Sequence, residues 1–188
     1  MNLLGVLASV RDLCLFRGGP EEMPYSPRLL VGLLVACGVV QVVFNLRDGV
    51  QPALAAGAVI GSLAIIVTVF LLLRRRGKSE RFVQTTTALA VVYLLYDVVS
   101  NLLTLLLPMD ELRKQLTSQP PHLPALSGPQ TLAMVVIAAL GIWQLCLWVG
   151  ILRRSLEIPV AGGVLVFLLL VFVNLVATAV AASVIGLA

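Results

Sequence analysis

The chain has 188 residues, of which 60% are hydrophobic and only 12% are charged, and its formal net charge is +4. A soluble domain of this length has too little interior to bury so much apolar surface, so the composition excludes an ordinary soluble protein. Apolar runs of 18 residues or more recur, and each is long enough to cross roughly 30 Å of hydrocarbon. The sequence therefore predicts an all-α, polytopic membrane protein whose single domain covers residues 1–188.

Residues 1–17 are apolar but too short to cross a membrane. At helical spacing Leu7 and Val10 share one face with other apolar residues, whereas Asp12 falls on the opposite face. Arg11 and Asp12 interrupt the apolar run, which argues against a cleaved signal peptide. We expect an N-terminal amphipathic helix that lies in the membrane interface, followed by a proline-punctuated elbow, GGPEEMPYSP.

Five later segments are expected to span the membrane as helices. They are residues 28–46, 53–73, 82–107, 130–152 and 159–186. Prolines stand at helix starts in Ser26-Pro27, Gly128-Pro129 and Ile158-Pro159, where a missing N–H costs nothing. All ten prolines lie outside the spans or at their ends, so the helices are expected to be continuous. In the second span the GAVIG segment, Gly57 to Gly61, would let a neighbouring helix come close.

The basic residues predict the orientation of the chain. Ten of the thirteen Lys and Arg residues lie on the side that holds the N-terminus, and five of these ten are in the connection RRRGKSER. Short cytoplasmic loops carry such an excess of positive charge. We therefore expect the N-terminus in the cytoplasm and the C-terminus outside. The basic run lacks interleaved aromatic residues, so a nucleic-acid partner is not expected.

Sequence motifs for catalysis or metal binding are absent. His122, the only histidine, sits in the loop 108–129 without a cluster of Cys, Asp or Glu beside it, so a metal site is not expected. Cys14, Cys37 and Cys146 form no CxxC pair and are interpreted as small packing residues. No nucleotide-binding, hydrolase or metalloprotease motif occurs, so we expect neither an enzyme nor a cofactor.

The third span carries a stripe of polar residues. Six of them fall within about 100° of arc on a helix: Thr86, Tyr93, Asp97, Ser100, Asn101 and Thr104. An aspartate that faces lipid at mid-depth costs about 2.5–3.5 kcal/mol, so the stripe should face the bundle interior or a wet cavity. Asn174 and Gln41 lie about 20–22 Å from the same edge, as Asp97 does, and are its expected partners.

Three interpretations of this intramembrane cluster remain open at this point. It can be a hydrogen-bonded cluster that holds the helices in register, a binding cavity or polar lipid site, or a site that handles a proton or an ion. No basic residue lies at the depth of Asp97 to pair with it.

The lead-in LFRGGPEEMPYSP is similar to that of small inner-membrane proteins of proteobacteria, and the five-span topology resembles the Yip1-type membrane proteins. The Asp-Leu-Tyr-Gly-Pro motif of the eukaryotic members is absent. What the resemblance implies is a helical membrane scaffold without known chemistry, in a bacterial inner membrane, and it assigns no site residues.

These observations favour a non-enzymatic membrane scaffold or accessory protein that binds other membrane proteins or lipid. The alternative is a small transporter or channel subunit whose pathway uses the Asp97 stripe. The expected partners are membrane lipids together with other membrane proteins or further copies of the chain. A transporter should contain a hydrated path, whereas a scaffold should have a dry, filled core.

Overall fold

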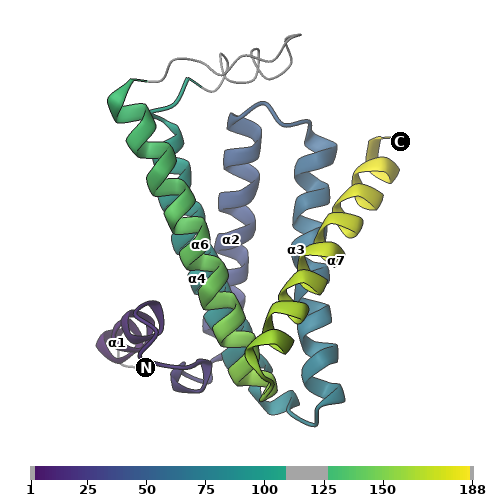
Figure 1. The fold of residues 1–188 in the computed structure, drawn as a ribbon. Coiled ribbons are helices and arrows are strands. Elements are labelled where there is room, and N and C mark those ends of the chain that lie inside the picture. The colour runs from purple at the N-terminus through teal and green to yellow at the C-terminus, as the bar shows by residue number, and fades with distance from the viewer. Residues whose placement is uncertain (1–2, 109–126, 187–188) are drawn as a thin grey trace.

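The structure, a computed structural model, describes residues 3–108 and 127–186. Within these residues five helices are long and apolar enough to cross a membrane: α2 (Pro27–Arg47), α3 (Pro52–Arg75), α4 (Phe82–Thr104), α6 (Gly128–Leu156) and α7 (Val160–Gly186) (Figure 1). The predicted all-α fold with five spans is thereby confirmed, and the chain is a polytopic membrane protein. His122 and most of its loop lie outside the described residues.

The helix boundaries follow local capping chemistry. The Ser26 hydroxyl accepts a hydrogen bond from the Leu29 amide at 3.3 Å, and Ser127 and Gln130 form a capping box at the start of α6. The third span ends at Thr104, earlier than the sequence pattern suggested. The fourth continues to Leu156, where Glu157 adopts a left-handed conformation with φ 52° and stops the helix.

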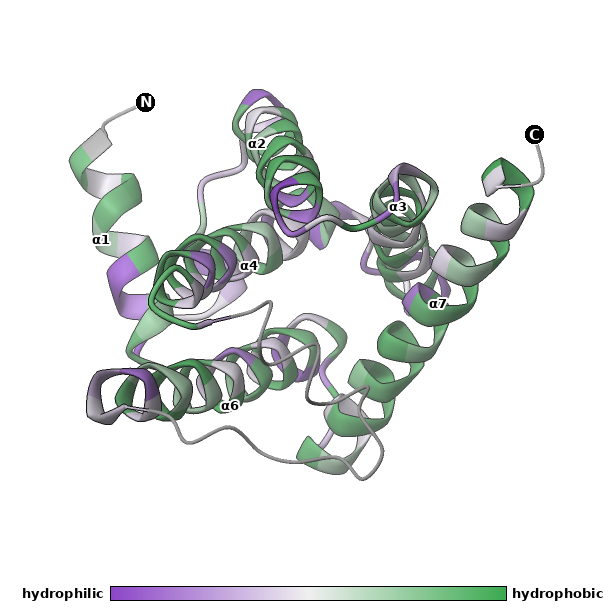
Figure 2. Cartoon of the chain, turned by 90° about the horizontal axis from the view of Figure 1, so that it is seen from above, coloured by the Kyte–Doolittle hydropathy of each residue, from purple (hydrophilic) through white to green (hydrophobic). Residues whose placement is uncertain are grey.

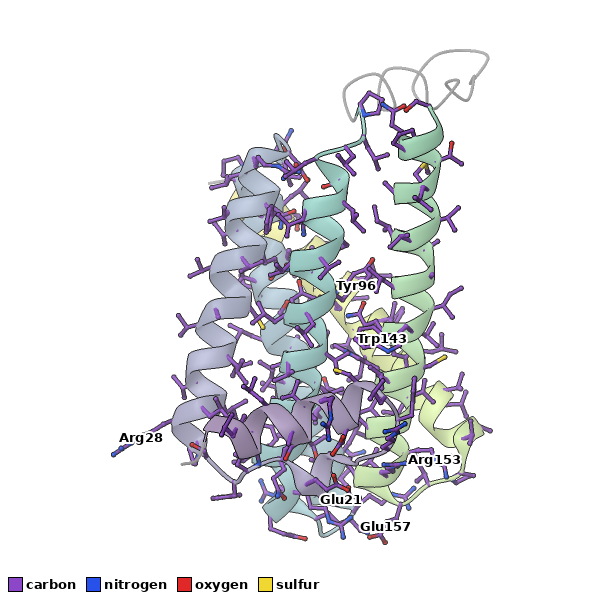
Figure 3. The ribbon with its side chains drawn as sticks, turned by 90° about the vertical axis from the view of Figure 1, so that its left-hand side faces the viewer. Glu21, Arg28, Tyr96, Trp143, Arg153 and Glu157 are labelled. Atoms are coloured by element: carbon purple, nitrogen blue, oxygen red, sulfur yellow. The ribbon has the colours of Figure 1, made fainter. Side chains whose placement is uncertain are left out.

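The N-terminal helix α1 (Leu3–Cys14) lies across the ends of the spans instead of joining the bundle (Figure 3). Its inner face is held by Leu13, which is buried, and Leu4 and Leu7 on its outer face are exposed. The Trp143 indole of α6 donates a hydrogen bond to the Cys14 carbonyl at 3.1 Å. The predicted N-terminal helix is thereby confirmed, and its position in the membrane interface stays a prediction that the exposed leucines favour.

The elbow after α1 is fastened to two spans. It contains the short 3₁₀ helix η1 (Pro20–Glu22). The Gln84 side chain of α4 donates hydrogen bonds to the Met23 carbonyl at 2.8 Å and the Glu21 carbonyl at 3.1 Å. Arg154 of α6 donates to the Gly18 carbonyl. The elbow is therefore part of the folded structure, with Met23 buried beneath it.

The spans form a bundle that is closed at one end. We call the end that holds the N-terminus, the α3–α4 connection and the α6–α7 turn the N-terminal side (Figure 1). From that end α6 and α7 diverge, and seen from above the C-terminal end of α7 lies far from the start of α6 (Figure 2). Helix α4 is the most enclosed of the spans. In an 18-residue apolar stretch of each span, 44% of the residues are buried in α4, compared with 6% in α2 and 6% in α7.

The main apolar core lies toward the N-terminal side, where α1, the elbow and four spans meet. Its fully buried members include Met23, Leu73, Val92, Leu152 and Leu170. Two buried hydroxyls, Thr85 of α4 and Ser155 of α6, are satisfied by a mutual hydrogen bond of 2.8 Å. This region combines dense packing with paired polar groups, as a stable interior requires.

Glycines bring α3 and α7 into close contact. A Cβ on Gly57 would lie 2.7 Å from the Thr178 carbonyl oxygen, and one on Gly61 would lie 2.9 Å from the Asn174 carbonyl oxygen. Contacts that short leave no room for any side chain, so the backbones touch because both positions are glycine. The GAVIG segment therefore has the close-packing role that its sequence predicted.

An ion cluster joins the two connections on the N-terminal side. Glu157, which follows α6, pairs with Lys78 and, at 3.0 Å, with Arg81. Arg81 ends the short 3₁₀ helix η2 (Ser79–Arg81) before α4. The hydrogen bond and charge of Lys78, and then Arg81, lower the pKa of the Glu157 carboxyl. The pairs tie the α3–α4 connection to the α6–α7 turn, although exposed pairs of this kind contribute little stability.

Candidate functional site

A cavity of about 480 Å³ lies between the five spans, and every span contributes to its wall. Most lining residues are Leu, Ile, Val, Ala or Gly, for example Leu34, Ile66 and Val171. Taking the helical rise of 1.5 Å per residue, most of the wall lies about 10–22 Å from the N-terminal-side ends of the helices. The cavity therefore occupies the middle of the membrane-spanning region.

Polar side chains interrupt this apolar wall, and they come from all five spans. They are Gln41 of α2, Ser62 of α3, Thr86, Tyr93 and Tyr96 of α4, Gln144 and Trp148 of α6, and Asn174 of α7. Six of the eight, all except Thr86 and Trp148, lie at a common depth of about 17–21 Å. Tyr96 points from α4 toward α6 (Figure 3). The wall is thus mainly apolar, with a belt of amide and hydroxyl groups near mid-membrane.

Unmet hydrogen-bonding capacity gathers in this wall. Within the described residues, four buried side-chain atoms have no hydrogen-bond partner: Thr86 Oγ1, Trp148 Nε1, Asn174 Oδ1 and Asp97 Oδ2. The first three belong to residues that line the cavity. Orphan polar atoms are rare in folded interiors and costly in a low dielectric, so three among the lining residues mark the least satisfied part of the described bundle.

One interhelical hydrogen bond crosses the belt. Ser62 of α3 donates to the Gln41 Oε1 of α2 at 3.3 Å and also to the Ala58 carbonyl at 3.1 Å. On the other side Asn174 packs against Gly61, where its amide oxygen occupies the space that a Cβ would take. These contacts position Gln41 and Asn174 on the wall and leave the centre of the cavity open.

The predicted stripe on α4 divides into two parts. Thr86 and Tyr93 line the cavity, together with Gln41 and Asn174 from the other predicted helices. The remaining members turn toward their own backbone: Ser100 donates to the Asp97 carbonyl at 3.2 Å and Thr104 to the Asn101 carbonyl at 2.7 Å. Thr104 also accepts a hydrogen bond of 3.2 Å from Arg47 at the far end of α2.

One of the two carboxylate oxygens of Asp97 is hydrogen-bonded within its own helix, whereas Oδ2 has no partner. Its Oδ1 accepts a hydrogen bond from the Asn101 amide at 3.1 Å, and the same amide donates to the Asp97 carbonyl at 2.8 Å. The expected hydrogen bonds to Asn174 and Gln41 are not the ones that form. Depth alone could not distinguish these possibilities, because an i, i+4 neighbour competes with any group across the bundle. Asp97 is half-buried and does not line the cavity.

Comparison with known proteins adds no family. No protein-family model, curated protein or solved structure matches the chain. The similarity to Yip1-type proteins is therefore limited to the shape of a five-helix membrane protein, and the belt must be interpreted from its own chemistry.

Sequence reasoning missed four belt or wall residues. Ser62 and Trp148 were overlooked because they sit alone among apolar neighbours, and Tyr96 because it lies beside the polar stripe of α4 and not within it. With a fourth span that ends at residue 152, as the sequence predicts, Gln144 would lie only about 12 Å from the N-terminal side and level with no other predicted polar residue. The helix continues to Leu156, which puts Gln144 about 18 Å from its end and level with the belt.

Proposed function

We propose that this chain is a non-enzymatic accessory protein of the membrane that binds a lipid-like amphiphile in the central cavity. The main support is a cavity of about 480 Å³ at mid-membrane depth, with an apolar wall and a polar belt supplied by all five spans. Sites for small molecules have this size, and they combine apolar lining with a few polar groups that fix orientation. An apolar body with one hydrogen-bonding group matches both features.

The orphan atoms support an occupant with its own hydrogen-bonding groups. Trp148 Nε1 can only donate, Asn174 Oδ1 can only accept, and Thr86 Oγ1 can do either. Thr86, Trp148 and Asn174 lie about 6, 12 and 21 Å from the N-terminal-side ends of their helices, so one polar group of an amphiphile can serve only one of these atoms, and Asn174 Oδ1 is the one level with the belt. A filled, dry core, which a purely structural scaffold would need, does not fit a cavity of this volume.

The proposal contains no chemical step. The polar lining residues carry amides, hydroxyls and an indole, and Asp97, the only carboxylate in the spans, lies outside the wall. Such groups bind and orient, but they do not supply a general base with a suitable pKa. Membrane lipids, and through them other membrane proteins, are the proposed partners.

We test the site by filling it. A Cβ on Gly38, which lines the cavity, meets nothing within 4 Å, and the same holds for Gly32, which lies on α2 but does not line the cavity. Gly38→Leu should therefore fold yet occupy ligand space, with Gly32→Leu as the matched control. A steric conflict of about 1–3 kcal/mol corresponds to at least a several-fold loss of occupancy. Crosslinking of photoactivatable lipid analogues and native mass spectrometry of bound lipids report that occupancy.

The expected result is a loss of crosslinking in Gly38→Leu alone. Equal labelling of both variants and the unmodified chain would contradict the proposal, because the label would then report lipid on the outer surface. Trp148→Phe adds a test of the orphan N–H in the cavity wall, since it keeps an aromatic ring beside Phe167 and removes that donor.

A small carrier is the second candidate, because the same cavity reaches the middle of the membrane.

We propose that the N-terminal side faces the cytoplasm of a bacterium, on the basis of its ten basic residues. A reporter fused after residue 50 should then lie outside and one fused after residue 78 inside. The reverse result would invert the orientation.

A further inference from the structure

A second recess lies beside α6 on the N-terminal side of the bundle. It has a volume of about 390 Å³ and lies between the end of α1, α6 and the start of α7. Phe16, Val149, Gly150 and Val164 are among its apolar walls, and Arg153 and Arg154 close its outer end. We call it the arginine groove.

The two arginines have different tasks in this groove. Arg154 donates a hydrogen bond to the Gly18 carbonyl and so holds the elbow that forms one wall. Arg153 is exposed, and no carboxylate of the described residues forms an ion pair with it. Of the nearby carboxylates, Glu157 is already paired with Lys78 and Arg81, and Glu22 packs against Gly18 on the elbow. A guanidinium at the end of an apolar groove is thus left to meet an anion.

The length of the groove matches one half of a membrane. From Arg153 the wall follows α6 to Leu145, a distance of eight residues or about 12 Å. Half of a hydrocarbon core is about 15 Å. An acyl chain lying along Val149, Gly150 and Leu145 would place its phosphate at the arginines. The long axis of the groove therefore runs in the same direction as a phospholipid in the leaflet on the N-terminal side.

We propose that the arginine groove binds an anionic phospholipid from the leaflet on the N-terminal side. The surrounding surface is strongly basic, which concentrates anionic lipid there, and basic pockets between spanning helices bind phosphate headgroups. Arg153 contacts the phosphate, Arg154 keeps the elbow in place, and the apolar wall takes a chain. This site is independent of the occupant of the central cavity, although Leu145 lies in the walls of both.

Two variants and one control test the proposal on the full chain. Arg153→Gln removes the charge and keeps the packing of the side-chain stem against α7. Arg28→Gln makes the same change at an exposed arginine on the same side, which points away from the bundle on the opposite edge of the view (Figure 3). Gly150→Leu fills the groove, since a Cβ there meets nothing within 4 Å. Purified protein is incubated with equal amounts of phosphatidylglycerol and phosphatidylcholine, and retained lipids are counted by native mass spectrometry.

The unmodified chain should retain phosphatidylglycerol in preference to phosphatidylcholine. Arg153→Gln should lower that preference about fivefold, the factor that one basic residue near an anionic surface contributes. Arg28→Gln should leave it unchanged, and Gly150→Leu should reduce retention of both lipids. Equal losses in Arg153→Gln and Arg28→Gln would overturn the proposal in favour of diffuse attraction to the surface. Unchanged retention in Gly150→Leu would also overturn it, because the acyl chain would then lie elsewhere.

Discussion

The two halves of the bundle differ in whether their buried polar groups have hydrogen-bond partners. On the N-terminal side Thr85 and Ser155 satisfy each other, and Gln84 serves two carbonyls of the elbow. Around the central cavity the neighbouring residue Thr86 keeps an unpaired hydroxyl, as Asn174 keeps an unpaired amide oxygen. Adjacent residues of α4 thus differ: the buried hydroxyl of Thr85 has a hydrogen-bond partner, and the buried hydroxyl of Thr86 has none.

Packing also differs between the N-terminal side and the region around the central cavity. The N-terminal side is closed by α1, the elbow and the ion cluster at Glu157, so four spans converge on one dense core. Farther along the helices α6 and α7 separate, and α7 packs along α3, with which it is in close contact at Gly57 and Gly61 (Figure 1). The apolar core thus lies at the closed end, and the cavity lies where the helices separate. We expect substitutions in the two regions to have different consequences.

The largest effect is expected at the glycine contact, which holds α7 beside the cavity. Gly61→Leu would drive a side chain into the Asn174 backbone and should cost about 3 kcal/mol or more, because backbone cannot yield as a side chain can. Gly32→Leu is the control, since it faces open space and gains helix propensity. Thermal unfolding in detergent measures both. If the two variants unfold at the same temperature, α7 does not depend on this contact.

An intermediate effect should separate the two threonines. Thr85→Val leaves the buried Ser155 hydroxyl without its partner and should cost about 1–3 kcal/mol. Thr86→Val removes a hydroxyl that has no partner, so its free energy of unfolding should be unchanged or slightly raised. The two substitutions are identical in chemistry and adjacent in sequence. Equal losses of stability would mean that the cavity half is as fully satisfied as the core.

The smallest effect is expected at Asp97. Asp97→Asn keeps the hydrogen bond from Asn101, and Asp97→Leu still leaves the Asn101 amide bonded to the residue 97 carbonyl. Both should change stability by about 0.6 kcal/mol, the mean value for polar side-chain contacts within a membrane. Lipid and proton flux in proteoliposomes gives the second readout. Loss of flux in both variants with unchanged stability would favour the carrier over the accessory protein.

The sequence by itself determined which segments cross the membrane and where most helices begin. These features are local, since they depend on runs of apolar residues, on Ser26 and Ser127 as caps, and on proline in the first turn. The close helix contact at GAVIG was also predictable from the sequence, because two glycines one turn apart allow any neighbouring helix to approach. The sequence placed Gln41 and Asn174 at a common depth, and that depth is where both lie on the cavity wall.

Only the tertiary structure decided which polar residues meet. A stripe on one helix specifies a direction, but it does not specify whether Asp97 reaches across the bundle or bonds to Asn101 one turn away. Tyr96 and Trp148 became part of the wall because α6 packs against α4 and then diverges from α7. The cavity itself exists because the helices converge at one end and separate beyond it. That divergence depends on contacts between distant segments, which no local pattern encodes.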